Sequence, residues 1–208
     1  MGQRLIGITG GIASGKSTVA SYLGKQHRLP LLDADVYSRN ALYQVEAQVL
    51  ARYSTQVTTY VEHQPTLDRA KLAEIIFANA PERTWLENLL HPLVRQCFES
   101  ELRRLAAQPT LVLIIPLLLE VGWQDLVTET WLIYCPPDLQ LKRLIQRNHL
   151  TPAAAQLRLD CQWPIERKLT LVDRVIDNSL ELDPQAKNWQ NLYHQVDRAL
   201  LVPDGNHL

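Results

Sequence analysis

"LIGITGGIASGKST", residues 5–18, is the stretch that decides the fold. Its glycines and Lys16-Ser17 satisfy the spacing G-x-x-x-x-G-K-[ST], after a short apolar run and before a helix-like one. Glycines let backbone N–H groups turn inward around a phosphate, and the N-terminus of a helix favours the same negative charge. In such a loop Lys16 reaches the outer phosphates and the Ser17 hydroxyl can ligate Mg²⁺. The stretch therefore predicts a nucleoside triphosphate site between a strand and a helix.

The composition is that of an ordinary globular chain. The 208 residues are 46% apolar and 21% charged, with a formal net charge of −1. This net charge shows no excess of basic residues that would favour binding to nucleic acid, and no apolar run is long enough to span a membrane. The three cysteines, Cys97, Cys135 and Cys161, suggest neither a disulfide framework nor a zinc cluster, so we expect buried thiols. These features, with no signal peptide at the start, predict a cytoplasmic protein with no nucleic-acid or membrane partner.

Short apolar runs alternate with helical stretches along the chain. Five runs predict strands: Leu5–Thr9, Leu29–Leu32 followed by Asp33, Leu111–Ile115, Trp131–Cys135 and Arg174–Ile176. Helical patterns cover Ser17–Gly24, 85–105 and Asp138–Asn148, and a further helix begins at Thr151-Pro152. The alternation predicts an α/β fold, a doubly wound five-stranded parallel sheet carrying the phosphate loop. Residues 36–105 contain no obvious strand and predict a helical insertion.

Two carboxylates end the second predicted strand in the sequence "LLDAD". Asp33 and Asp35 would lie at the carboxyl edge of the sheet, near the phosphate loop. A carboxylate there can accept a proton from an acceptor hydroxyl or hold a metal through water. Either residue could instead cap the following helix, an interpretation that is stronger for Asp35.

Arginines follow the strand-like run "WLIYC". Arg143 and Arg147 are four residues apart, so they share one face of a helix, and Arg158 lies on the next helix. In small kinases a mobile helical lid closes over the transferred phosphate and excludes water, and helices after a strand can form such a lid. Arginines suit this task because they stay charged. The alternative is a solvated helix face with no contact to substrate.

The chain resembles the dephospho-coenzyme A kinase family. The matching pieces are "ITGGIASGKSTVA", "LLDAD", "TLDRAKLAEIIFANAPERTWLENLLHPLVR", "IPLLLEVGW", "CPPDLQLKRLIQRNHLT" and "VDRVIDN", in the family's order from Leu5 to Asn178. The phosphate loop alone is common to many kinases, whereas "LLHPLVR", "PLLLE" and "VIDN" together are much more specific. The resemblance implies a core of about 1–35, 106–137 and 166–208, a helical acceptor-binding insertion of about 36–105 and a lid of about 138–165.

The resemblance also implies the reaction and the residues that bind ATP. The γ-phosphoryl group of ATP, bound with Mg²⁺, would pass to the ribose 3′-hydroxyl of dephospho-coenzyme A. Asp33 would be the base, assisted by Lys16, Arg143 and Arg147. The implied ATP-binding residues are Gly11, Ala13, Ser14, Gly15, Lys16, Ser17, Thr18 and Asn178, with Ser17 also on the metal. Asn178 follows the last strand, where the adenine would lie in this architecture, although a turn asparagine is an equally good interpretation.

The implied acceptor-binding residues are scattered along the chain. They are Asp33, Arg69, His91, Arg95 and Glu120. His91 could instead be a core or capping histidine, and Glu120 could form a plain ion pair. Pro92 should break or restart the helix that contains His91 and Arg95.

The sequence departs from the family pattern in places. The family's loop commonly has Gly where this chain has Ala13, and we expect Ala13 to keep a negative φ at little cost. The segment "YQVEAQVLARY" lacks the usual Gly or Pro, so we expect a more helical or shorter connection there. The closing residues "LVPDGNHL" predict a frayed tail.

Two rival functions remain open at this point. Another small-molecule kinase would share the phosphate loop but not "HPLVR" and "PLLLE". A nucleotide-dependent switch protein would need an exposed apolar patch and would lack acceptor-side residues. Nothing in the sequence predicts an oligomeric state.

Overall fold

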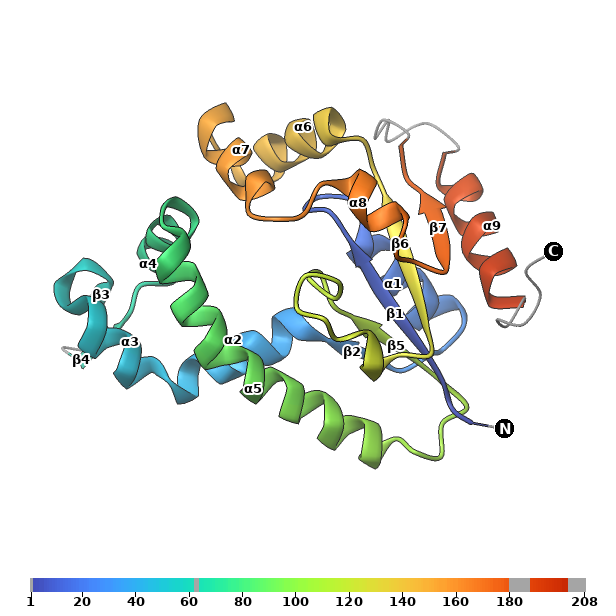
Figure 1. Ribbon diagram of the computed structural model, residues 1–208, viewed down its shortest axis with the longest axis horizontal. Coiled ribbons are helices and arrows are strands. Elements are labelled where there is room, and N and C mark those ends of the chain that lie inside the picture. The colour runs from blue at the N-terminus through green and yellow to red at the C-terminus, as the bar shows by residue number, and fades with distance from the viewer. Residues whose placement is uncertain (1, 62–63, 180–187, 202–208) are drawn as a thin grey trace. The chain divides into compact units, whose positions relative to one another are not determined.

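The computed structural model describes residues 2–61, 64–179 and 188–201, which fall into two compact units (Figure 1). The core unit consists of Met1–Asp33 and Ala106–Leu208, and the helical unit of Ala34–Leu105. The predicted tail at residues 202–208 lies outside the described residues.

A five-stranded sheet forms the centre of the core unit. Its strands are β1 (Arg4–Gly10), β2 (Leu31–Asp33), β5 (Thr110–Ile114), β6 (Glu129–Tyr134) and β7 (Arg174–Asp177). They are all parallel, in the order β2-β5-β1-β6-β7. Ile8 of β1 stands opposite Ile114 on one side and Trp131 on the other. The prediction of a five-stranded parallel α/β sheet is confirmed, and β1 brings the phosphate loop to the middle of its carboxyl edge.

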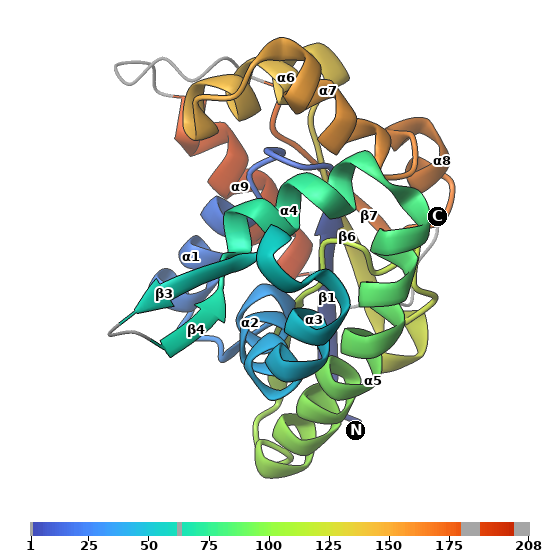
Figure 2. The same ribbon diagram turned by 90° about the vertical axis from the view of Figure 1, so that its left-hand side faces the viewer.

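Helices cover the sheet on both faces, as Figures 1 and 2 show. On one face α1 (Lys16–Gln26) and α9 (Asn188–Leu201) pack against alternate strand residues such as Ile6, Ile8 and Ile133, all fully buried. Each such side chain contributes about 1.5–3 kcal/mol to folding. On the opposite face lie α8 (Ile165–Leu169) and the segment after β5, where Leu118 and Val127 close on Gly7 so tightly that a Cβ there would touch them.

Three further helical segments complete the core unit. They are η2 (Gln124–Leu126), α6 (Pro137–Asn148) and α7 (Pro152–Asp160). The predicted start at Thr151-Pro152 is confirmed, because the Thr151 side chain accepts from the Ala154 N–H and Pro152 is the first helical residue.

The helical unit, whose helices and hairpin are labelled in Figure 2, has its own apolar core. Its elements are α2 (Ala34–Gln44), α3 (Glu46–Tyr53), η1 (Ser54–Gln56), β3 (Thr58–Val61), β4 (Gln64–Leu67), α4 (Arg69–Ala78) and α5 (Ala80–Arg104). Buried residues from α3, α4 and α5, including Val49, Leu72 and Leu86, pack together there. The expectation of a more helical connection is confirmed, since α2 and α3 cover nearly all of "YQVEAQVLARY".

The absence of strands from the insertion was a wrong prediction. β3 and β4 pair in an antiparallel hairpin, with Thr58 opposite Leu67. Each strand has four residues and most of their side chains are exposed, so the hairpin lacks the apolar run that marks a buried strand.

The prediction that Pro92 interrupts the helix was also wrong. α5 runs unbroken over 25 residues with Pro92 inside it. A proline costs about 3 kcal/mol in a helix interior through a lost hydrogen bond and a clash with the preceding turn. Buried Leu86, Val94 and Phe98 on both sides of Pro92 hold the two halves in line and offset that cost.

The cysteines only partly fit expectation. Cys135 is buried, whereas Cys97 and Cys161 are partly exposed, so the prediction of three buried thiols was wrong for two of them. No disulfide joins any of these three cysteines in the described part of the chain.

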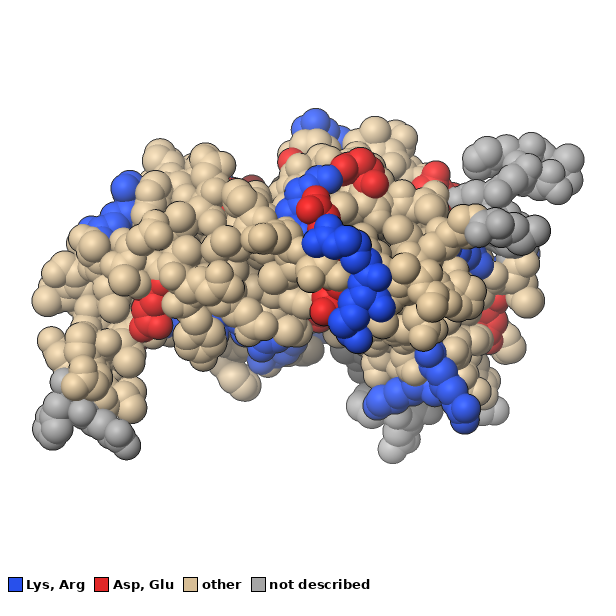
Figure 3. Space-filling model, turned by 90° about the horizontal axis from the view of Figure 1, so that it is seen from below, with Lys and Arg blue, Asp and Glu red and all other residues tan. Residues whose placement is uncertain are grey.

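Charge is distributed without a dominant sign. On the face drawn in Figure 3, Lys and Arg side chains lie among Asp and Glu side chains, in keeping with the net charge of −1. Among the described residues, no helix combines the length and the apolar character that crossing a membrane requires.

Candidate functional site

The phosphate loop joins the carboxyl end of β1 to the first turn of α1. Gly15 is the N-cap of α1 with φ 99°, and no side chain caps this helix end. A left-handed φ at this position favours glycine. The N–H groups of the first turn therefore point to the space above the loop, and the helix dipole gives that space a positive potential. This arrangement suits a bound phosphate.

Lys16 and Ser17 stand where the motif predicts them. The Lys16 ammonium folds over its own loop and donates to the carbonyl oxygens of Gly10 and Gly11 at 2.9 and 2.8 Å. The Ser17 side chain is exposed at the start of α1. The loop thus holds the Lys16 cation against its own first carbonyl groups.

Ala13 has the opposite backbone conformation to the one expected from the sequence. Its φ is +57°, in the left-handed region, so the prediction of a negative φ was wrong. This region costs a non-glycine residue about 1–2 kcal/mol because the Cβ approaches a carbonyl oxygen. Ala13 is the third residue of a turn in which the Ser14 N–H donates to the Gly11 carbonyl at 3.2 Å, and one type of such a turn has a positive φ at this position.

Three side-chain amides from distant segments contact this loop. The Gln162 Oε1 accepts from the Ile12 N–H at 2.7 Å, and the Asn178 Nδ2 donates to the Ser14 carbonyl at 2.7 Å. The third, Gln140, donates to the Cys135 carbonyl at 2.6 Å and lies against Gly11, where a Cβ would collide with it. The loop is therefore held from outside as well as by its own turns.

Asn178 follows β7 and is nearly buried beside the phosphate loop. Its side chain is 7% exposed and its amide also lies against Gly15, where a Cβ would collide with it. Its amide therefore supports the loop at Ser14 and Gly15.

Asp33 is the last residue of β2 and stands in register with Ile114 of β5. Since Ile8 of β1 also pairs with Ile114, Asp33 lies two strand spacings, roughly 10 Å, from β1 along the same edge. Its side chain is partly exposed, whereas Asp35 is exposed in the first turn of α2. The carboxyl edge thus carries a cation at β1 and a carboxylate at β2.

The two arginines of α6 have different environments although they share a face. Arg143 is 7% exposed, and its guanidinium donates to the Asn178 carbonyl at 3.2 Å and to the Cys135 Sγ at 3.3 Å. Burial raises the pKa of the Cys135 thiol, which favours its protonated form. Arg147 is exposed and donates to the Asn148 side chain at 2.9 Å.

Glu120 forms the ion pair that the sequence left open as an alternative. Its Oε1 lies 2.6 Å from the Nζ of Lys168, a side chain with no exposed surface, and also accepts from the Trp163 N–H at 3.2 Å. The Oε2 is buried with no hydrogen-bond partner in the described residues. Glu120 therefore anchors the segment between α7 and α8.

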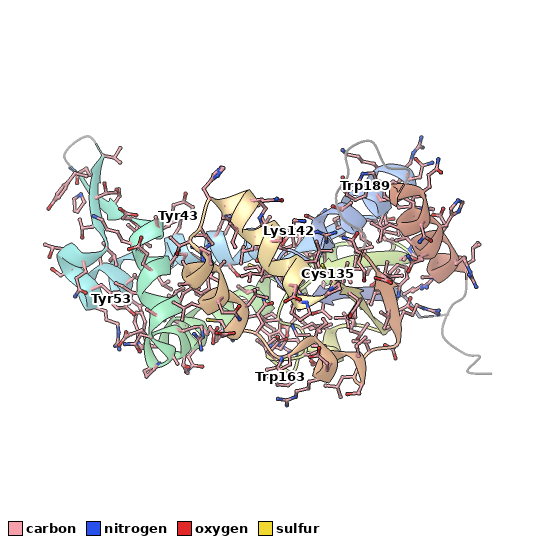
Figure 4. The ribbon with its side chains drawn as sticks, turned by 90° about the horizontal axis from the view of Figure 1, so that it is seen from above. Tyr43, Tyr53, Cys135, Lys142, Trp163 and Trp189 are labelled. Atoms are coloured by element: carbon pink, nitrogen blue, oxygen red, sulfur yellow. The ribbon has the colours of Figure 1, made fainter. Side chains whose placement is uncertain are left out.

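A hollow of about 480 Å³ opens beside the loop in the core unit. It is lined by Gly11, by residues of α6 and α7, and by Gln162 to Glu166. In Figure 4 the labels Lys142 and Trp163 mark α6 and the segment between α7 and α8, and both of these stretches line the hollow.

The other acceptor candidates lie in the helical unit. His91 and Arg95 are one turn apart on α5, and Arg95 donates to Glu99 at 3.1 Å. Partial burial lowers the pKa of His91, which favours its neutral form. Arg69 begins α4, and its guanidinium lies 4.4 Å from the ring centroid of Tyr43, at a hollow of about 270 Å³.

Sequence reasoning missed Gln140, Gln162 and Lys168. Gln162 is 150 residues from the loop it contacts, so no local spacing marks it. Lys168 is fully buried, yet its sequence "IERKL" is typical of an exposed helix. Only the fold brings these residues to the site.

Comparison with known proteins gives a consistent result. The family described as dephospho-CoA kinase matches residues 4–183. A protein named dephospho-CoA kinase from Prochlorococcus marinus strain MIT 9313 is 50% identical over 181 residues, covering 85% of this chain and 89% of that protein. One of the same name from Synechococcus elongatus is 47% identical over 201 residues, covering 95% and 91%.

Solved structures agree with these sequence comparisons. TT1252 from Thermus thermophilus superposes with a TM-score of 0.77 at 31% identity, covering 99% of this chain and all of that one. A dephospho-CoA kinase from Campylobacter jejuni gives a TM-score of 0.65 at 27% identity, covering 95% of each chain. A shikimate kinase from Bacteroides thetaiotaomicron, at 12% identity and a TM-score of 0.51, shares the fold, and covers 95% of this chain and 96% of its own.

Proposed function

The chain belongs to the dephospho-CoA kinase family, and from that premise we propose which of its residues perform the reaction. The enzyme phosphorylates dephospho-coenzyme A with ATP, giving coenzyme A and ADP, the last step of coenzyme A synthesis. The observation that carries the assignment of roles is the carboxyl edge of the sheet, with Lys16 above β1 and Asp33 at the end of β2. A loose phosphoryl-transfer transition state needs positioning and charge balance, which these groups supply.

The phosphate loop binds ATP. The residues that surround the phosphates are Gly11, Ala13, Ser14, Gly15, Lys16, Ser17 and Thr18, and backbone N–H groups of the loop and of the start of α1 donate to them. The Lys16 ammonium leaves its two carbonyl partners and moves to the β- and γ-phosphates, which are stronger acceptors because they are charged. It then offsets the negative charge that develops during transfer.

Asp33 is the base for the acceptor hydroxyl. The 3′-hydroxyl of the ribose donates to this carboxylate, which orients the oxygen toward the γ-phosphorus and takes the proton late in the transfer. The partial exposure of the side chain at the sheet edge leaves it accessible to a substrate.

The two α6 arginines have separate tasks. Arg147, exposed at the end of the helix, donates to the transferring phosphoryl group when the lid of residues 138–165 closes. Arg143 acts from its buried position, where it adds positive charge beneath the site and holds Asn178 under the loop. Asn178 serves ATP binding through that support.

Four residues bind the acceptor together with Asp33. Arg95 and Arg69 offer guanidinium groups to the pyrophosphate of dephospho-coenzyme A, and the neutral His91 offers a hydrogen bond. Glu120 keeps one buried oxygen without a protein partner among the described residues, which can accept from a substrate hydroxyl or amine.

A Mg²⁺ ion fits the start of α1. The exposed Ser17 hydroxyl, next to the space where the phosphates bind, is the kind of oxygen ligand that Mg²⁺ takes together with substrate phosphates. When bound, the ion supplies further neutralisation of phosphate charge. The proposed setting is the cytoplasm, with the small-molecule substrate as the partner and neither nucleic acid nor a membrane.

The test of this function is ADP production from Mg-ATP with a panel of acceptors. The panel contains dephospho-coenzyme A, AMP, adenosine, shikimate, gluconate and water alone. We expect turnover with dephospho-coenzyme A to exceed the other rates by far. Faster turnover with a different acceptor would leave the ATP site in place and contradict dephospho-coenzyme A as the substrate. The absence of any acceptor-stimulated turnover would favour a nucleotide-dependent switch protein.

A further inference from the structure

One residue of the phosphate loop, Ala13, has a backbone conformation that is strained for any residue other than glycine. Ala13 lies at φ +57°, and its neighbours on either side are the two loop residues held by distant side chains. The Ile12 N–H donates to Gln162, and the Ser14 carbonyl accepts from Asn178. The strained residue is thus bracketed by two hydrogen bonds from outside the loop.

Gln162 is itself held rigidly on both sides. Its N–H donates to the Leu159 carbonyl at 3.0 Å, in the turn that ends α7. The next residue, Trp163, donates its N–H to Glu120, which is paired with the buried Lys168. A side chain fixed at its base in this way can impose a position on the peptide it binds.

We propose that Gln162 is a positioning residue of the phosphoryl transfer, holding the Ile12 peptide so that Ala13 keeps its left-handed conformation. The proposal rests on the function given above, because its consequence is the binding of ATP. With Ala13 in this conformation, the loop N–H groups converge on one phosphate before ATP arrives. Without Gln162, Ala13 relaxes toward negative φ, and ATP must restore the loop when it binds.

The experiment measures ATP binding and tests whether Gln162 matters because Ala13 is strained. Gln162→Met keeps the size of the side chain and removes the oxygen that accepts from Ile12. The same change is then made in a chain carrying Ala13→Gly, since glycine adopts a positive φ without strain. ATP affinity is measured by equilibrium titration without acceptor, and kcat and the KM for each substrate by steady-state kinetics.

We expect Gln162→Met to weaken ATP binding roughly three- to tenfold, the loss that one hydrogen bond represents. The KM for ATP should rise by a similar factor, while the KM for dephospho-coenzyme A stays unchanged. In the chain carrying Ala13→Gly the same substitution should cost less than about twofold, because no strain remains for Gln162 to oppose. A general loss of packing would cost the same in both chains.

Gln156→Met is the matched control. Gln156 lines the same hollow from α7, but its amide donates to Asp160 rather than to the loop. Equal ATP affinity of the Gln162→Met and Gln156→Met variants would overturn the proposal, as would equal losses in the chains with and without Ala13→Gly. If Gln162→Met fails to fold, Gln162→Asn replaces it, since the shorter amide cannot reach Ile12. Because the titration contains no acceptor, a failure of the proposed substrate leaves this test intact.

Discussion

The phosphate loop and the helical unit differ in how their functional groups are organised. The loop gathers its donors within residues 10–18, and distant amides only support it. The helical unit spreads its candidates over α4 and α5, and each depends on helices packed around a separate core. Substitutions in the loop should therefore affect chemistry with little effect on stability. Substitutions in the helical unit should affect acceptor binding or stability and leave ATP chemistry alone.

The largest effect is expected at Lys16. Lys16→Ala should lower kcat about 10³-fold, because the only side-chain cation of the loop is lost from the transition state. The melting temperature should stay near that of the unaltered chain, since the hydrogen bonds from Lys16 to the Gly10 and Gly11 carbonyls stay within its own loop. The control is Lys25→Ala in the last turn of the same helix. Near-normal turnover of a folded Lys16→Ala variant would contradict the role of the loop in phosphoryl transfer.

Asp33 should give the second-largest effect. Asp33→Asn keeps the shape of the side chain and removes its basicity, so kcat should fall about 10²-fold, at the low end for general-base catalysis. The loose transition state explains why the loss is smaller than at Lys16. Asp35→Asn, two residues further and exposed in α2, should change kcat less than about threefold. A larger loss at Asp35 than at Asp33 would reverse their assignment.

The same contrast explains what could be predicted from the sequence. The motif specifies Lys16 and Ser17 because their chemistry needs a fixed local spacing, and buried parallel strands show as continuous apolar runs. The conformation of Ala13 could not be predicted, because it depends on the turn between Gly11 and Ser14 and on contacts from residues 162 and 178. Local preference alone predicted the wrong φ.

The helical unit was harder to predict for a related reason. Pro92 stays inside α5 because buried residues on both sides outweigh the local cost of proline. The exposed β3–β4 hairpin has no buried face to give it a recognisable pattern. Tertiary packing decides the helix at Pro92 and pairing between strands decides the hairpin, and neither shows in the local pattern of a single sequence.

On the acceptor side, Arg95 tests whether the helical unit acts on substrate binding alone. Arg95→Ala should raise the KM for dephospho-coenzyme A about tenfold, the effect of losing one charged hydrogen bond. The KM for ATP and kcat should change less than about twofold. The control is Arg103→Ala, near the end of the same helix and exposed. A fall in kcat with an unchanged acceptor KM would place Arg95 in the chemistry and break the contrast between the two regions.

The smallest effect concerns stability and involves no substrate. Glu82, in the first turn of α5, accepts from Arg52 at 2.7 and 3.0 Å and from the Tyr53 hydroxyl at 2.6 Å. These hydrogen bonds lower the pKa of Glu82 from 4.5 to about 2. Because the folded state holds the carboxylate charged, the stabilisation is complete above pH 4.5 and is lost as the pH falls toward 2.

Glu82→Gln removes this titration, so the melting temperature of the variant should fall less steeply than that of the unaltered chain over that pH interval. The difference should be small, because the cluster is partly exposed. Glu74→Gln, at an exposed position on α4, should keep the original slope. At neutral pH the kinetics of Glu82→Gln should match those of the unaltered chain. If its pH slope is unchanged, the Arg52–Glu82–Tyr53 cluster does not stabilise the helical unit through charge, and its apolar core alone accounts for the fold of that region.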